Sequence, residues 1–191
     1  MLSIPEFLPQ VFQLLGNQKK AVRREACWVI SNVTAGNMEQ IALVMDNLEY
    51  VQALIKIAMK DLPEVILYIC LFLFVKVQRE AIWALSNATK NAQPHQIAKM
   101  IEMEVMDCFI QLLDSQDHKT VEVVLEGINN MLNWGAHAAN EGNTGENEFL
   151  VILENKGGVK KIEELQMHPS TEVYTKALKI LETHFEIDSV L

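Results

Sequence analysis

Apolar residues recur at helical spacing along most of the chain, and the pattern predicts a series of helices joined by short polar turns. In the segment 118–134, for example, Val121, Val124, Leu125 and Ile128 follow the i, i+3, i+4, i+7 spacing of one helix face. The same periodicity predicts further helices in the segments 4–17, 38–47, 48–61, 94–104, 105–117, 145–157, 158–170 and 172–185. No strand is expected outside one continuously apolar run, residues 65–75.

Two of the predicted helices carry nearly the same motif. EACWVISNVT at residues 25–34 and EAIWALSNAT at residues 80–89 share Glu, Ala, Trp, Ser, Asn and Thr at matching positions. Trp28 and Trp83 are 55 positions apart, and the spacing falls to 43 if residues 66–77 are set aside. A period of about 40–47 residues with three helices per period is typical of armadillo-type helical repeats. The chain is therefore predicted to be a repeat protein.

The predicted fold class is all-α, an armadillo-repeat right-handed superhelical solenoid of about four repeats, the first of them incomplete. In such a solenoid each repeat buries its apolar face only against its neighbours. The whole chain, residues 1–191, is expected to form a single array. The expected repeats are 1–36, 37–91, 92–135 and 146–187, with a polar loop rich in Gly, Asn and Glu at 135–148.

The segment 66–77 interrupts this pattern, because removing it restores the repeat. One interpretation is that it derives from a retained intron or a faulty gene model. The other is a genuine insertion that forms an apolar extension of the following helix or a lid. The apolar run 65–75, which overlaps it, is shorter than the roughly 20 residues that a membrane-crossing helix needs. The net charge of -9 argues against anionic membranes as well, so no membrane partner is expected.

The repeated motif places Trp and Asn on one helix face. Trp28 and Asn32 are four positions apart, as are Trp83 and Asn87, and residues i and i+4 of a helix lie one above the other. An indole face can hold the aliphatic stem of Lys or Arg, and a carboxamide can pair with the N–H and C=O of one peptide unit. Packing alone would tolerate Leu or Phe at the Trp position and would disfavour Asn inside a helix. The recurrence therefore favours a peptide-binding groove over a purely structural role.

Acidic residues complete the predicted groove. Glu25 and Glu80 each precede a Trp by three positions, so they lie on roughly the same face and can receive a cationic head group. The formal net charge of -9 agrees with a basic partner and argues against nucleic acid. Together these features select a peptide that is extended and rich in Lys and Arg.

Other chemistry finds little support in the sequence. Cys27, Cys70 and Cys108 show no metal-binding spacing and are expected to be reduced, buried thiols. No phosphate-binding loop, nucleophile motif or paired catalytic carboxylates are apparent, so neither an enzyme nor a bound metal or cofactor is expected.

At these motifs the chain resembles importin alpha, the armadillo adaptor that carries nuclear localisation signals. EACWVISNVTAGN and EAIWALSNAT look like the family's Trp–Asn signature, and KKIEELQ with ALKILETHF resembles its last repeats. The resemblance covers nearly the whole chain except residues 66–77. It implies the C-terminal part of the armadillo domain, which contributes the minor signal-binding site. There the Trp residues would stack, the Asn residues would clamp the peptide backbone, and the Glu residues would meet basic side chains.

The resemblance also implies partners and a location. Proteins bearing nuclear localisation signals would be the cargo. In the family the last repeats also contact the exportin that returns the adaptor to the cytoplasm, so residues 150–187 are candidates for that contact here. Such adaptors move between cytoplasm and nucleus. The sequence shows neither a basic importin beta binding segment nor the earlier repeats of the major site. Two alternatives stay open: a scaffold in adhesion or signalling that resembles the catenins, whose basic grooves bind acidic peptides, and an inactive truncated product.

Overall fold

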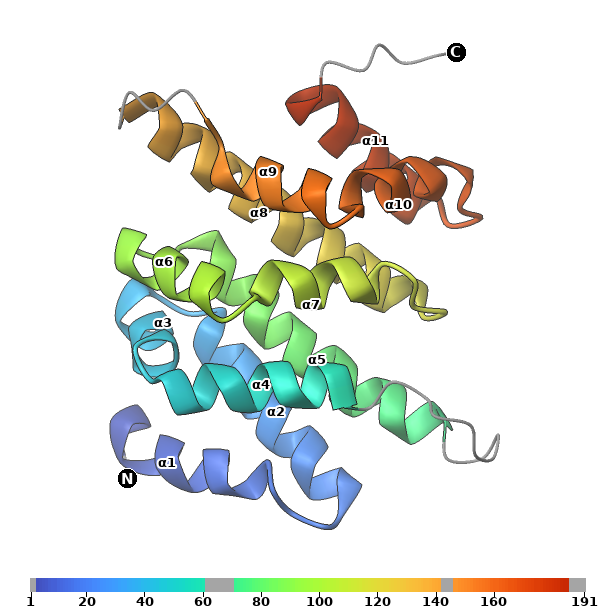
Figure 1. Cartoon of the computed structure of the whole chain (residues 1–191). Helices are drawn as coiled ribbons and strands as arrows, with labels where there is room; N and C mark the ends of the chain where they lie inside the picture. Colours follow the sequence, from blue (N-terminus) through green and yellow to red (C-terminus); the bar gives the residue numbers. More distant parts are fainter. Residues whose placement is uncertain (1–2, 61–70, 142–145, 186–191) are drawn as a thin grey trace. The chain divides into compact units, whose positions relative to one another are not determined.

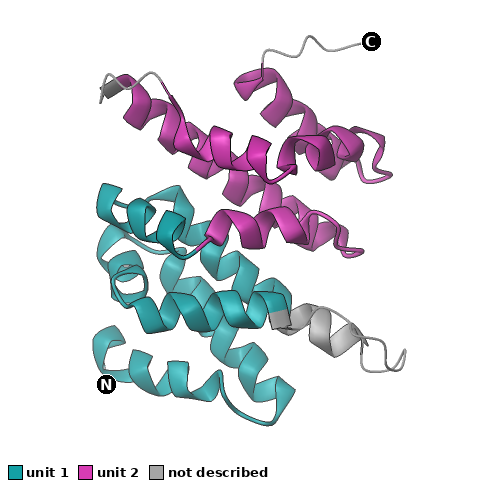
Figure 2. Ribbon diagram, in the orientation of Figure 1, with its two compact units in different colours: residues 1–103 teal, residues 104–191 magenta. Residues whose placement is uncertain are grey.

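Helices make up the regular secondary structure that the computed structural model describes, which covers residues 3–60, 71–141 and 146–185. The chain divides into two compact units, residues 1–103 and residues 104–191 (Figures 1 and 2). Unit 1 contains α1 (Ile4–Leu14), α2 (Lys20–Thr34), α3 (Met38–Met45), α4 (Leu48–Lys60), α5 (Leu71–Lys90) and α6 (Pro94–Glu102). Unit 2 contains α7 (Val105–Leu112), α8 (His118–Glu141), α9 (Glu148–Asn155), α10 (Gly158–Glu164), a 3-10 turn (Leu165–Met167) and α11 (Thr171–His184).

The predicted all-α class is confirmed, and every helix expected from the periodicity is present. The expected single array and its repeat bounds stay predictions, since the structure gives only the two compact units. The boundary between the units lies between Met103 and Glu104. It therefore falls inside the expected repeat 92–135, between that repeat's first and second helices.

In unit 1 the two motif-bearing helices pack directly against each other. α2 lies alongside α5, α4 packs on α5, and α1 packs on α2. Ile30 of α2 and Ile82 and Leu85 of α5 have no exposed surface. Burying a side chain of this size stabilises a fold by about 1.5–3 kcal/mol, so this interface anchors the positions of both motifs.

Short polar residues set the helix boundaries. Asn37 and Gln40 form a reciprocal capping box at the start of α3, with each side-chain oxygen 2.9 Å from the other residue's backbone nitrogen. The Asn147 side chain accepts the backbone N–H of Phe149 at 3.2 Å at the start of α9. These caps satisfy N–H groups that have no partner within their own helix. The start of α3 agrees with the expected residue 38, whereas α9 begins at Glu148 and not at the expected residue 145.

The C-terminal part of α8 differs from the prediction. The helix continues to Glu141, so the loop expected at 135–148 is wrong for residues 135–141. Gly135 is buried, and a Cβ at this position would collide with the Asn147 side chain. Asn147 donates a hydrogen bond from Nδ2 to the carbonyl oxygen of Leu132 at 2.8 Å, and Trp134 meets Phe149 edge-on with ring centroids 6.4 Å apart. The glycine permits close packing within unit 2 and does not mark a loop.

The apolar segment 66–77 is only partly within the described residues. Residues 66–70 lie outside them, and the backbone of residues 71–77 forms the first turns of α5. The helical backbone of that second part agrees with an extension of α5, whereas the interpretation as a gene-model error stays untested.

Two of the three cysteines lie in the described residues. Cys27 and Cys108 are buried and take part in no disulfide, as expected from the sequence, and Cys70 lies outside the described ranges. Burial, with a smaller contribution from the neighbouring Asp107 charge, raises the pKa of the Cys108 thiol to about 12. Both thiols are therefore packing residues. Among the described helices, none combines the length and the apolar character needed to cross a bilayer.

Candidate functional site

The two tryptophans of the repeated motif lie on the surface of unit 1. Trp28 on α2 is 55% exposed and Trp83 on α5 is 45% exposed, which is unusual for the largest apolar side chain. The buried faces of the two helices carry Cys27 and Ile30 on α2 and Ile82 on α5, each with no exposed surface. Helical periodicity therefore turns both indoles outward while their neighbours form the core.

Polar contacts join the two motifs across the α2–α5 interface. Asn87 donates a hydrogen bond from Nδ2 to the carbonyl oxygen of Ser31 at 3.2 Å. The Ser31 hydroxyl donates to its own helix at Trp28 O (3.0 Å) and lies 3.5 Å from Oε2 of Glu80. Residues separated by about fifty positions in the sequence thus come together, and the second motif is held beside the first.

Each asparagine already uses one amide hydrogen within unit 1. Asn32 donates from Nδ2 to the carbonyl oxygen of Trp28 at 2.7 Å, and Asn87 donates to Ser31 as described above. A carboxamide has two N–H donors and an acceptor oxygen. Within the described part of the chain neither Oδ1 receives a hydrogen bond. Each amide therefore keeps an N–H and an oxygen for a ligand, and the bond that it makes fixes its orientation.

The two predicted carboxylates have different surroundings. Glu25 is exposed and accepts hydrogen bonds at Oε1 from Nε (3.0 Å) and Nη2 of Arg24. Glu80 is half-buried, and this burial raises the pKa of its carboxyl above 4.5, although the charge of Arg79, the Ser31 hydrogen bond and the charge of Arg24 act in the opposite direction. A carboxylate that is partly removed from water gains more from a neighbouring cation than an exposed one does.

A small surface pocket brings three of the predicted residues together. Its volume is about 230 Å³, and it is lined by Trp28, Glu25, Glu80 and Arg24. An indole beside two carboxylates suits a cationic side chain, whose stem can lie on the ring while its head meets the acids. Trp83, Asn32 and Asn87 do not line this pocket and lie elsewhere on the α2 and α5 surfaces.

The sequence analysis missed Arg24. Residues i and i+1 of a helix do not face each other, so nothing in the motif predicted that Arg24 would turn back onto Glu25. Its guanidinium is nonetheless part of the pocket wall. The only available signal was its place beside a predicted ligand-binding acid.

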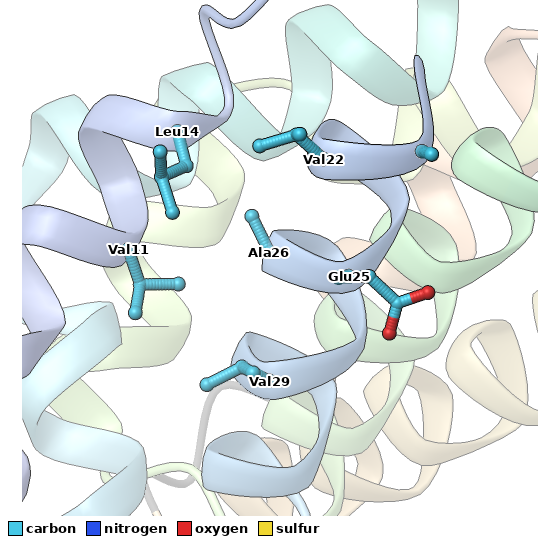
Figure 3. Close-up of a pocket in the computed structure, with 7 residues that line it drawn as sticks. Val11, Leu14, Val22, Glu25, Ala26 and Val29 are labelled. Carbon is cyan, nitrogen blue, oxygen red and sulfur yellow. The ribbon is translucent and has the colours of Figure 1, made fainter. Parts of the chain in front are cut away.

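A second pocket, also missed, lies between α1 and α2. Its volume is about 320 Å³ and its lining is almost entirely apolar. Figure 3 shows Val11 and Leu14 on one helix facing Ala26 and Val29 on the other, while the Glu25 carboxylate points away from them. Glu25 therefore stands at the rim of this apolar pocket and in the wall of the charged one.

The described residues show no metal-binding arrangement. Within these ranges, no three His, Cys, Asp or Glu side chains gather in a way that could hold a metal ion.

Comparison with known proteins gives consistent results. The family described as "Atypical Arm repeat" matches residues 147–190. Importin subunit alpha-5 of Arabidopsis thaliana is 34% identical over 171 residues, which is 90% of this chain and 30% of that protein. Importin subunit alpha-1a of Oryza sativa subsp. japonica is 35% identical over 93% of this chain and 32% of its own length. This chain thus spans about 30% of the length of these relatives.

The similar solved structures include designed repeat proteins. A designed armadillo repeat protein in complex with the peptide (KR)4 is 28% identical, with a TM-score of 0.72 over 92% of this chain and 63% of that one. A computationally designed armadillo repeat protein for modular peptide recognition is 25% identical, with a TM-score of 0.71.

Proposed function

Because this chain belongs to the importin alpha family of armadillo-repeat proteins, we propose that it binds nuclear localisation signal peptides, which are extended and rich in Lys and Arg. The solved structures confirm the armadillo fold class that the sequence predicted. The proposed site is the surface of α2 and α5 in unit 1, and it corresponds to the minor signal-binding site of the family. Because the chain spans only about 30% of its relatives, the role of a complete transport adaptor is part of the proposal.

The observation that carries the proposal is the pair of exposed indoles on two directly packed helices. Trp28 and Trp83 each lie on a helix whose opposite face is core, and Asn87 ties one helix to the other. Exposed Trp side chains leave apolar surface in water, which costs free energy unless a ligand covers it. A stretched peptide that lays basic side chains across both rings would cover that surface and reach the carboxylates.

A solved relative supports the charge of the ligand. The designed armadillo repeat protein that resembles this chain was captured with (KR)4, an alternating basic peptide. The net charge of -9 on this chain and the two carboxylates near Trp28 suit the same class of ligand. An acidic peptide, as expected for a catenin-like scaffold, would meet repulsion at Glu25 and Glu80.

The partners and location follow from the same proposal. The cargo would be proteins that carry nuclear localisation signals, and residues 150–187 would contact the exportin that returns the adaptor. The chain would accordingly occur in cytoplasm and nucleus. The relatives reported above are importin subunits and designed peptide binders, and neither group consists of enzymes.

Isothermal titration calorimetry with (KR)4 tests the proposal. The parent chain should bind the peptide, and Trp83→Ala should weaken binding by about tenfold or more, because a stacked ring buried by a ligand contributes about 1–2 kcal/mol. Trp134→Phe is the matched control, because Trp134 lies in unit 2 against Phe149 and outside the proposed site. Equal affinity of Trp83→Ala and the parent would exclude the groove, and no binding by the parent would favour an inactive product.

A further inference from the structure

We propose that Arg24 is an internal competitor for the ligand's basic side chain, because its guanidinium occupies the carboxylate on which that side chain would bind. The inference rests on the proposed function and concerns the same pocket. It makes Arg24 a residue that sets the affinity and the selectivity of the site without belonging to the Trp–Asn–Glu motif.

The geometry of the pocket supports this role. Arg24 donates both Nε, at 3.0 Å, and Nη2 to a single oxygen of Glu25, Oε1. The Arg24 side chain is 35% exposed and that of Glu25 is 58% exposed. The ion pair is therefore open to solvent and forms one wall of the pocket that Trp28 and Glu80 complete. A ligand cation that enters this pocket meets a carboxylate that already has a partner.

The charges in the pocket lead to the same conclusion. Two carboxylates and one guanidinium line it, so Arg24 cancels half of the negative charge that would attract a cation. The charge of Arg24 also reaches Glu80, whose carboxyl it helps to keep ionised. An incoming Lys or Arg must displace Arg24 from Glu25 or bind beside it, and both routes cost electrostatic free energy.

The same competition creates a preference among ligands. A purely basic peptide that takes Glu25 leaves the Arg24 guanidinium without a carboxylate. A peptide with an aspartate close to the basic residue could supply a new partner, so that one ion pair is exchanged for two. A pocket with two unpaired carboxylates would bind mixed-charge peptides much more weakly than purely basic ones. In this pocket the difference in affinity should be smaller.

Peptide titration of charge variants tests the inference. Arg24→Gln should bind (KR)4 about three- to tenfold more tightly than the parent at low ionic strength, because the competitor and one repulsive charge are both removed. Lys19→Gln is the matched control: it removes the same charge from an exposed position at the start of α2, outside the pocket, and should leave affinity within about twofold. A series of otherwise identical basic peptides with one Asp or Asn placed at successive positions should show a smaller loss of affinity for Asp relative to Asn in the parent than in Arg24→Gln.

Arginine side-chain NMR adds a readout that follows the displacement itself. Binding of (KR)4 should move the Arg24 Nε–H resonance towards that of a solvated guanidinium. The resonance of Arg23 should stay unchanged, because its Nη1 is held by the backbone oxygens of Asn17 and Gln18. Equal or weaker binding by Arg24→Gln when the parent does bind would overturn the competitor role and leave the proposed function intact. If neither the parent nor Arg24→Gln binds, both proposals fall.

Discussion

Asn87 offers a test that separates structural support from ligand binding, because its only described side-chain bond crosses from α5 to α2. In Asn87→Ala the hydrogen bond from Nδ2 to Ser31 O is lost. That oxygen still accepts the backbone N–H of Ala35 at 3.0 Å and the hydroxyl of Thr34 at 3.1 Å, so no buried acceptor is left unsatisfied. The lost bond should cost about 0.5–1.5 kcal/mol, and the higher helix propensity of Ala returns roughly 0.5 kcal/mol.

The free energy of unfolding should therefore fall by no more than about 1 kcal/mol in Asn87→Ala, as measured by urea denaturation followed by circular dichroism. The affinity for (KR)4 should fall by about tenfold, since the amide clamp on the peptide backbone is removed. Asn32→Ala is the matched comparison, because Asn32 is exposed and its one hydrogen bond within the described residues goes to its own helix, at Trp28 O. It should leave stability unchanged and weaken binding. If Asn87→Ala lost more than about 3 kcal/mol of stability but kept its peptide affinity, Asn87 would have a structural role only. That result would refute the proposed hydrogen bonding of its amide to the peptide backbone.

Two further predictions concern charge and packing. Peptide affinity should decline as the pH falls, beginning above pH 4.5, because burial raises the pKa of Glu80 and only its ionised form attracts a cation. In a pH series of titrations, Glu80→Gln should lack this early decline. A parallel decline in the parent and in Glu80→Gln would contradict the role of Glu80. Gly127→Ala should destabilise unit 2 by about 1–3 kcal/mol despite the better helix propensity of Ala. The reason is that the new Cβ would lie 2.5 Å from Cε2 of the fully buried Phe109. Unchanged or higher stability in thermal unfolding would show that the Phe109 ring can move aside.

The sequence predicted the helices well because the signals that define them are local. Apolar periodicity located α1 to α11, and the Asn37 cap lies directly before the expected start of α3. The start of α9 was less well predicted, because the helix expected over 145–157 begins at Glu148, after the Asn147 cap. The exposure of Trp28 and Trp83 also followed from their positions relative to the buried stripe of each helix. That those side chains bind a peptide stays a prediction.

The features that sequence reasoning missed depend on contacts between distant residues. Gly135 resembled a loop signal, yet it is buried where α8 passes Asn147, a contact that no local pattern reveals. Arg24 turns back onto Glu25 although neighbouring positions on a helix point apart. The sequence also showed no sign that one N–H of each asparagine would be bound within unit 1, to Trp28 O for Asn32 and to Ser31 O for Asn87.

Tryptophan fluorescence gives the most direct test of the proposed groove, because the chain contains three Trp residues and only Trp134 lies outside the site. In Trp134→Phe all indole emission comes from Trp28 and Trp83, which are about half exposed. Titration with (KR)4 should change this emission saturably, with an affinity that falls as salt is added, while an acidic peptide of the same length should have no effect. Emission that stays constant at peptide concentrations where calorimetry detects binding would show that the indoles do not line the binding surface.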